Sequence, residues 1–427
     1  MSKRWTRMIP IMMVTYMVAF MDRTNISFAI PTMAKELHLT ATQLGFASGV
    51  LFLFYAASQP LGGMIADRGY GKPMVATLMI LWGLSEVAQG FIQTPAELII
   101  VRCLLGLFEG GLMVTFLLIV CNWFTVRERG RANGLWFLSF PVAAMVSGPI
   151  AGYILHLSSW RILFIAEGIL PIIWSLVWIW GVAATPREAK WLTEGERRDL
   201  QAKLEADRKE NAPHLDEAAP RLWQQMFRVP VLIYTLALFL WNFSFVGFII
   251  WLPSILHQDK SLSAVTVGWL ASLPFLVAVF VMLFLAWGSD KFHSRRLFAA
   301  VPIGLSGVVF VIAAHSYAGN SLAANLGLLI VAGSLLYGAQ PMIYAIPGDL
   351  VPTRVVATVI GIANGIGVVG DFLGPYVLGF VRQATGDFAS GLFLLGAALV
   401  VSGLLLVLVR DRAQTAALPE AKLVTAN

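Results

Sequence analysis

Residues 63–72 read GMIADRGYGK, and a similar charged turn at residues 286–296 reads AWGSDKFHSRR. Asp67 and Asp290, which correspond in the two turns, are 223 residues apart. The Gly-Pro pairs at 148–149 and 374–375 are 226 residues apart. Such a near-constant offset indicates an internal repeat. We therefore expect two similar halves.

The composition of the whole chain is that of a membrane protein. Of 427 residues, 58% are hydrophobic and 13% are charged, whereas soluble domains contain about 25% charged residues. Apolar runs near the bilayer-spanning length of about 20 residues recur along the whole chain. We predict an all-α polytopic protein whose twelve transmembrane helices lie at about 8–30, 43–66, 74–92, 97–119, 131–155, 161–184, 229–253, 264–288, 297–315, 322–345, 355–378 and 390–410.

The positions of Lys and Arg predict how these helices are oriented. With the N-terminus inside, 24 of the 30 Lys and Arg residues lie in inside segments, four lie outside and two lie within spans. By the positive-inside rule, both termini are cytoplasmic. We expect an N-terminal six-helix half at 1–184, a cytoplasmic central loop at 185–228 and a C-terminal six-helix half with a short cytoplasmic tail at 229–427. Residues 193–208 read as a charged surface helix within the loop, which tethers the halves.

Several other classes of protein fit the sequence poorly. The net charge of +6 is spread over loops and forms no clustered basic surface for nucleic acid. Two cysteines in or at the end of one predicted span and six scattered histidines indicate neither disulfides nor a metal site. The first span carries charges and no small-residue cleavage pattern, so it reads as a retained helix and not a signal peptide. No P-loop lysine, metal cluster or nucleophile–base pair is visible, so we expect neither an enzyme nor a cofactor.

Charged residues interrupt two of the spans. Asp22 and Arg23 lie near the middle of the first, where a charge costs about 2.5–3.5 kcal/mol and usually marks a path for something polar. Arg102 and Glu109 lie seven residues apart in the fourth, so they share one helix face about 10 Å apart. We predict that these four residues line one cavity. Glu86 lies near the outer end of its span, where it could reach water, and we interpret it as structural.

These charges suggest a division of labour. A buried arginine offers a planar fork to a carboxylate, whereas the protonation of a buried carboxylate depends on what surrounds it. Glu109, with fewer obvious partners, is the first candidate for a proton site, and Asp22 is the second. We expect Arg23 to be available to a substrate carboxylate, which would free or protonate Asp22. The alternatives are a packing ion pair between Asp22 and Arg23, and one from Glu109 to Arg102 or Arg23.

The two charged turns, RCLLG at 102–106 and the Gly-Pro segment near residue 148 resemble signatures of the major facilitator superfamily. The resemblance covers the whole chain and implies a transporter of two six-helix halves. It also implies that Asp67 latches the cytoplasmic gate by meeting a helix N-terminus of the other half, where an anion is favoured. Arg68, Asp290 and Arg296 belong to the same pair of gating turns.

Four further motifs resemble the anion:cation symporter family, which includes carriers of sugar acids, tartrate, phthalate and hydroxyphenylacetate. They are YxxAxxDRxNxS at 16–27, Tyr55, RxxxGxxE at 102–109 and WRxxFxxEG at 160–168. The resemblance implies a bacterial inner-membrane carrier that takes up a small organic anion with protons. It assigns proton coupling to Asp22 and Glu109, and substrate binding to Arg23, Arg102 and Tyr55.

The C-terminal half holds few charges within its spans. Asn242, Gln340, Tyr344 and Asn364 are candidates to hydrogen-bond a substrate, with helix packing as an equal alternative. Asp371 is either a third ionisable cavity group or a helix-packing partner.

Other transport modes and functions stay open as alternatives to symport. These are an organic-anion exchanger or exporter and a non-transporting nutrient sensor, although a sensor would usually add a sizeable soluble domain. We expect a monomer whose partners are the organic anion, protons and the lipid bilayer.

Overall fold

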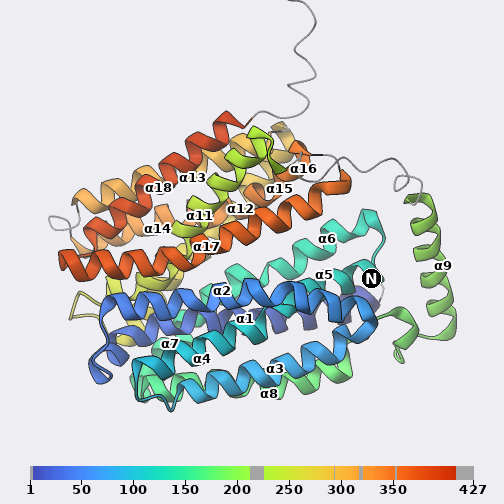
Figure 1. Cartoon of the computed structure of the whole chain (residues 1–427), viewed down its shortest axis with the longest axis horizontal. Helices are drawn as coiled ribbons and strands as arrows, with labels where there is room; N and C mark the ends of the chain where they lie inside the picture. The colour runs from blue at the N-terminus through green and yellow to red at the C-terminus, as the bar shows by residue number, and fades with distance from the viewer. Residues whose placement is uncertain (1–2, 212–225, 293, 317–320, 352, 410–427) are drawn as a thin grey trace, which may run out of the picture. The chain divides into compact units, whose positions relative to one another are not determined.

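The computed structural model describes residues 3–211, 226–292, 294–316, 321–351 and 353–409, which are helical apart from short connections (Figure 1). The elements up to residue 211 are α1 (Lys3–Glu36), α2 (Ala41–Ile65), η1 (Ala66–Tyr70), α3 (Gly71–Gln89), α4 (Pro95–Glu109), α5 (Gly111–Trp123), α6 (Val126–Phe137), α7 (Ser139–Leu157), α8 (Trp160–Gly181), η2 (Pro186–Glu188) and α9 (Glu194–Asn211). Those that follow are α11 (Val229–Leu256), α12 (Ala264–Phe292), α13 (Arg295–Ser316), α14 (Leu322–Gly338), α15 (Gln340–Ala345), α16 (Pro347–Leu350), α17 (Thr353–Thr385) and α18 (Ala389–Leu408).

Each of the twelve predicted spans falls on one of these helices or on a consecutive pair. In the described part of the chain, ten helical runs are long and apolar enough to cross a membrane. One of the ten runs, Ala41–Gln89, contains both α2 and α3. The helix α1 is not among the ten, and it carries Asp22 and Arg23 near its centre. The helical pattern is therefore consistent with twelve spans.

Large apolar side chains remain exposed on the outer faces of the helices, for example Trp180, Phe280 and Leu408, whose exposed fractions are 82%, 67% and 64%. So many exposed large apolar side chains are unusual on a soluble monomer. In a bilayer it is favourable, because the hydrocarbon core is itself apolar and the helices satisfy their own backbone hydrogen bonds.

The chain forms two compact units. The first comprises Met1–Asp216, Ile249–Leu276 and Pro375–Gly386, and the second comprises Glu217–Phe248, Val277–Gly374 and Asp387–Asn427. In the first unit α1 packs against α6, α7 and α8, while α2 packs on α4 and α3 packs on α8. In the second unit α13 packs against α14 and α18. The halves predicted at 1–184 and 229–427 stay a prediction.

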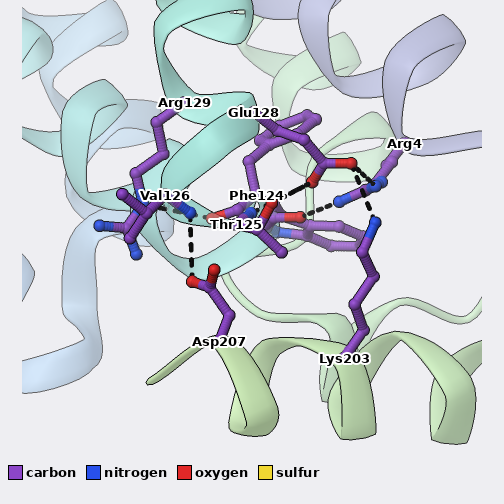
Figure 2. A network of polar contacts seen from close by, with 9 residues as sticks. Arg4, Phe124, Thr125, Val126, Glu128, Arg129, Lys203 and Asp207 are labelled. Atoms are coloured by element: carbon purple, nitrogen blue, oxygen red, sulfur yellow. Dashed lines mark hydrogen bonds and ion pairs between the residues drawn. The ribbon is translucent and has the colours of Figure 1, made fainter. Parts of the chain in front are cut away.

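The charged surface helix predicted at 193–208 is α9, and polar contacts join it to the ends of α1 and α6 (Figure 2). Glu128 accepts hydrogen bonds from Arg4 Nη2 at 2.7 Å and from Lys203 Nζ at 3.1 Å. Asp207 Oδ2 accepts from the Val126 backbone nitrogen at 3.1 Å, at the first turn of α6. A carboxylate at a helix N-terminus satisfies an otherwise unpaired N–H and is favoured by the helix dipole. These contacts attach α9 to the first unit.

The start of α9 is also attached to α1. Glu196 accepts hydrogen bonds from the Thr193 backbone nitrogen at 2.8 Å and from Lys3 Nζ at 2.9 Å. These hydrogen bonds hold the pKa of the Glu196 carboxyl below its usual value, since each favours the charged form. The hydrogen bond from the Thr193 backbone has the larger effect, and that from Lys3 follows.

Candidate functional site

The central turns of α1 carry polar residues on two sides of the helix. Tyr16 and Arg23 are seven residues apart, so they lie on one face, and Asp22 and Asn25 are three apart, so they lie on another. All four side chains are buried, with exposed fractions of 5% or less. Because adjacent helix residues point about 100° apart, Asp22 and Arg23 have different neighbours.

Arg23 forms an ion pair with Glu109 and not with Asp22. Its Nε lies 2.5 Å from Glu109 Oε2, and the exposed fractions of the two side chains are 5% and 0%. The guanidinium carbon also lies 4.3 Å from the Tyr55 ring centroid and 5.6 Å from that of Tyr16, which are cation–π distances. The alternative of a packing ion pair between Asp22 and Arg23 is therefore wrong, whereas the alternative of an ion pair from Glu109 to Arg23 is present. The expectation that Glu109 has few partners is also wrong.

Two glycines place Glu109 within reach of α1. A Cβ added at Gly106 would strike the Leu51 carbonyl oxygen of α2, and one added at Gly110 would strike the Tyr55 carbonyl oxygen. Only glycine permits such a close approach of two backbones. The end of α4 is thus held tightly against α2, which brings Glu109 and Tyr55 to the same guanidinium.

Arg102 is fully buried and only partly satisfied. Its Nη1 donates to the Asp22 backbone carbonyl at 3.4 Å, whereas its Nε and Nη2 have no hydrogen-bond partner among the described residues. It interacts electrostatically with Glu86, Glu109 and Asp22. Both carboxylate oxygens of Asp22 likewise lack a hydrogen-bond partner in the described part of the chain. The four predicted residues thus lie together, with unused donors and acceptors between them.

Two further carboxyl groups lie beside this group. Glu86 of α3 is fully buried, so the expectation that it could reach water is wrong. Its Oε1 accepts from Asn25 Nδ2 at 2.5 Å. Glu167 of α8 is 4% exposed and interacts with Asn25 and Glu86. Asp22 interacts electrostatically with Glu86 and with Glu167. The WRxxFxxEG motif contained Glu167, but spacing within one helix could not show that α8 packs on α1 and α3.

In the second unit the structure brings two of the predicted polar residues into direct contact. Tyr344 Oη donates to Asn364 Oδ1 at 3.3 Å, and the Tyr344 ring lies 6.0 Å from that of Trp241. Asn242 is 2% exposed and lies against the backbone of α17, since a Cβ added at Gly367 would be 2.5 Å from its Nδ2. Gln340 begins α15, one helical turn before Tyr344. Asp371 is half-buried on α17.

The residues of the first predicted gating turn are exposed. Asp67 and Arg68 lie in η1, between α2 and α3, where Gly69 has a φ of 89° that favours glycine. In the corresponding segment, Asp290 lies exposed in the last turn of α12, and Arg296, in the first turn of α13, donates from Nη1 to the Val409 carbonyl oxygen. The predicted latch between Asp67 and the other half stays a prediction.

Ionisable groups buried inside a bundle of apolar helices are typical of membrane transport proteins. The family model of the Major Facilitator Superfamily matches residues 12–375. The chain therefore belongs to this superfamily, whose members are transporters and not enzymes. The predicted family and the predicted all-α polytopic fold are confirmed.

Relatives of similar length are carriers with varied named substrates. A quinolone resistance transporter of Acinetobacter baumannii is 25% identical over 402 residues, covering 91% of this chain and 90% of that protein. A putative tartrate transporter of Agrobacterium vitis is 28% identical over 414 residues, covering 95% and 90%. The D-galactonate transporter of Escherichia coli O6:H1 is 26% identical over 408 residues, covering 92% and 93%. The last two agree with the resemblance to the anion:cation symporter family.

A solved structure shares the fold. The inward-open xylose transporter XylE from E. coli has a TM-score of 0.72 at 15% identity, covering 93% of this chain and 95% of that one. At this low identity the likeness concerns the fold alone.

Proposed function

We propose that the chain is a proton-coupled symporter of a small organic anion, either a sugar acid or an aromatic or dicarboxylic acid. The observation that carries this proposal is the buried Arg23–Glu109 ion pair beside Arg102. Two guanidinium nitrogens of Arg102 have no hydrogen-bond partner among the described residues. An arginine with unused donors is well suited to hold a carboxylate.

Competition for Arg23 links the anion to the proton. A substrate carboxylate that binds Arg23 displaces Glu109, which is then a buried carboxylate without its counter-charge. That state is costly, and uptake of a proton by Glu109 relieves it. Asp22, whose carboxylate has no hydrogen-bond partner in the described residues, is the second proton-coupling group. Glu109, rather than Asp22, is thus the direct competitor of the substrate.

The remaining assignments follow the chemistry of the substrate class. Tyr55 stacks on Arg23 and orients its fork toward the anion. The amides and hydroxyl of Asn242, Gln340, Tyr344 and Asn364 hydrogen-bond substrate hydroxyl groups. Tartrate and galactonate, the named substrates of two relatives, each combine carboxylate and hydroxyl groups, and this supports the assignment to such anions.

The carrier works as a monomer in the bacterial inner membrane, with both termini in the cytoplasm. Its halves alternate around the substrate. Asp67 and Arg68 act with Asp290 and Arg296 as the cytoplasmic gate.

An exporter of organic anions is the second candidate, and the quinolone resistance relative favours it. Transport driven by a proton gradient separates the two functions, because a symporter accumulates its anion when protons flow in the same direction. A proton-driven exporter accumulates it when protons flow in the opposite direction.

The test is uptake of labelled tartrate and D-galactonate into proteoliposomes with an imposed pH gradient of either sign. Symport predicts accumulation only with an inward proton gradient, abolished by a protonophore. Glu109→Gln should lose this accumulation and keep anion exchange, whereas Glu97→Gln, which changes an exposed acid on the same helix, should behave as wild type. Accumulation only with an outward gradient would establish the exporter, and full accumulation by Glu109→Gln would remove Glu109 from the mechanism.

A further inference from the structure

Glycines bring α3 and α8 together beside two buried acids. A Cβ added at Gly83 would lie 2.6 Å from the Gly168 carbonyl oxygen, and one added at Gly168 would lie 2.9 Å from Glu86 Cβ. Each glycine therefore lies against the other helix. Glu167 directly precedes Gly168, so this close approach places the Glu86 and Glu167 carboxyl groups in one buried region.

The two acids have very different surroundings. Glu86 Oε1 accepts hydrogen bonds from Asn25 Nδ2 at 2.5 Å and from Gln89 Nε2 at 3.4 Å. Glu86 also interacts electrostatically with the positive charge of Arg102. Glu167 lies beside Asn25 and Glu86, and neither of its oxygens has a hydrogen-bond partner among the described residues. Asn25 and the positive charge of Arg102 both favour a negative Glu86, whereas Asn25 alone among these groups favours a negative Glu167.

The charges on the neighbouring helices do not balance the pair. Asp22 on α1 adds a carboxyl that senses both Glu86 and Glu167. Arg23 on α1 is paired with Glu109 on α4. Arg102 on α4 interacts electrostatically with Glu86 and Asp22 as well as with Glu109. If every carboxyl were ionised, four negative charges would face two positive ones inside a buried site, which is costly unless protons bind.

Unfilled hydrogen-bond acceptors in the same region point independently to a bound proton. Asn25 Oδ1 and Gln89 Oε1 belong to fully buried side chains, and neither has a partner in the described part of the chain. Buried polar atoms are normally hydrogen-bonded. An ionised carboxylate can only accept, whereas a protonated one has an O–H to donate. A proton on a carboxyl group here would supply the missing donor.

We propose that Glu86, Asn25 and Glu167 form a second proton-binding site, separate from Glu109, in which Glu167 holds the proton and Glu86 is ionised. Asn25 is the positioning residue, because its amide holds Glu86 in the ionised form beside Glu167. The consequence for transport rests on the proposed function: the carrier takes up one proton more than Glu109 and Asp22 account for.

Infrared spectroscopy of the purified full-length protein tests the site without transport. A buried carboxylic acid gives a C=O stretching band that shifts in D₂O and is separate from the carboxylate bands. Glu167→Gln should remove one such band at neutral pH. Glu86→Gln should remove only a carboxylate contribution, as should the control Glu97→Gln, which replaces an exposed, ionised acid. Loss of only a carboxylate band in Glu167→Gln would overturn the proposal. Glutamine has the shape of a protonated glutamate, so a Glu167→Gln variant that failed to fold would also count against it.

The number of protons carried with each anion tests the transport consequence. In proteoliposomes, the reversal potential of anion flux should show one proton fewer per anion in Glu167→Gln than in wild type. An equal proton count would refute the second site as part of transport. Wild-type flux with no proton dependence would instead refute the proposed symport, and the infrared result would then still decide whether Glu167 is protonated.

Discussion

The Arg23–Glu109 ion pair predicts an unusual effect of Glu109→Gln on anion binding. At alkaline pH the ionised Glu109 holds Arg23, so a substrate must displace it. Glutamine is neutral and mimics the protonated acid. The variant should therefore bind the anion more tightly than wild type at alkaline pH, even though it cannot drive proton-coupled accumulation.

The size of the effect follows from the interaction released. A hydrogen bond between charged groups contributes about 1.5–3 kcal/mol, which corresponds to roughly a 10- to 150-fold gain in affinity. Loss of Glu109 also leaves Arg23 as an uncompensated buried charge, which costs about 3–5 kcal/mol. The empty variant should be less stable than wild type, and the anion should recover much of this stability.

Calorimetry and thermal unfolding with tartrate, D-galactonate and related acids, at acidic and alkaline pH, measure both effects. We expect wild-type affinity to fall as pH rises, and Glu109→Gln affinity to stay high throughout. The control, Glu97→Gln, should follow wild type. Equal or weaker binding by Glu109→Gln at alkaline pH would refute the competition for Arg23.

Further substitutions test other parts of the site. Arg102→Lys replaces a planar fork with a point charge, and we expect a loss of anion affinity of about tenfold or more by calorimetry; unchanged affinity would limit Arg102 to packing. Gly106→Ala places a Cβ against the Leu51 carbonyl oxygen, and overpacking of this kind costs about 1–3 kcal/mol in thermal unfolding; an unaltered melting temperature would contradict the close approach of α2 and α4. Lys203→Ala removes a largely exposed ion pair with Glu128, so stability should fall by no more than about 1 kcal/mol with uptake unchanged; loss of uptake would show that α9 takes part in transport.

The helical membrane fold could be predicted because the apolar runs and the charged turns of the sequence indicated the same arrangement of helices. Apolar runs near 20 residues gave the spans, and the two charged turns gave the repeat. The end of α2 and the start of α3 flank the turn at Gly69, whose positive φ suits its glycine. The breaks between α4 and α5 and between α6 and α7 were not predicted, because a helix that bends within the membrane keeps its apolar composition.

The sequence predicted four charged residues of the candidate site, but it predicted poorly which of them form an ion pair. Intramembrane charge identified Asp22, Arg23, Arg102 and Glu109, because each is costly in an apolar helix. Their partners depend on how helices pack, which spacing along one helix does not contain. Adjacency in the sequence suggested that Arg23 interacts with Asp22. Successive helix residues point about 100° apart, and the Arg23 side chain pairs with Glu109 instead. Packing of α8 on α3 likewise adds Glu167, which lies far from the others in the chain.

The coupling of anion to proton is measured most directly by counting the protons that the purified carrier takes up when it binds an anion. Calorimetry in buffers of different ionisation enthalpy gives this number without any membrane gradient. At alkaline pH we predict net proton uptake on binding of tartrate or D-galactonate by wild type, and loss of the contribution of Glu109 in Glu109→Gln. Binding without proton uptake, or uptake that Glu109→Gln leaves unchanged, would contradict the proposed coupling.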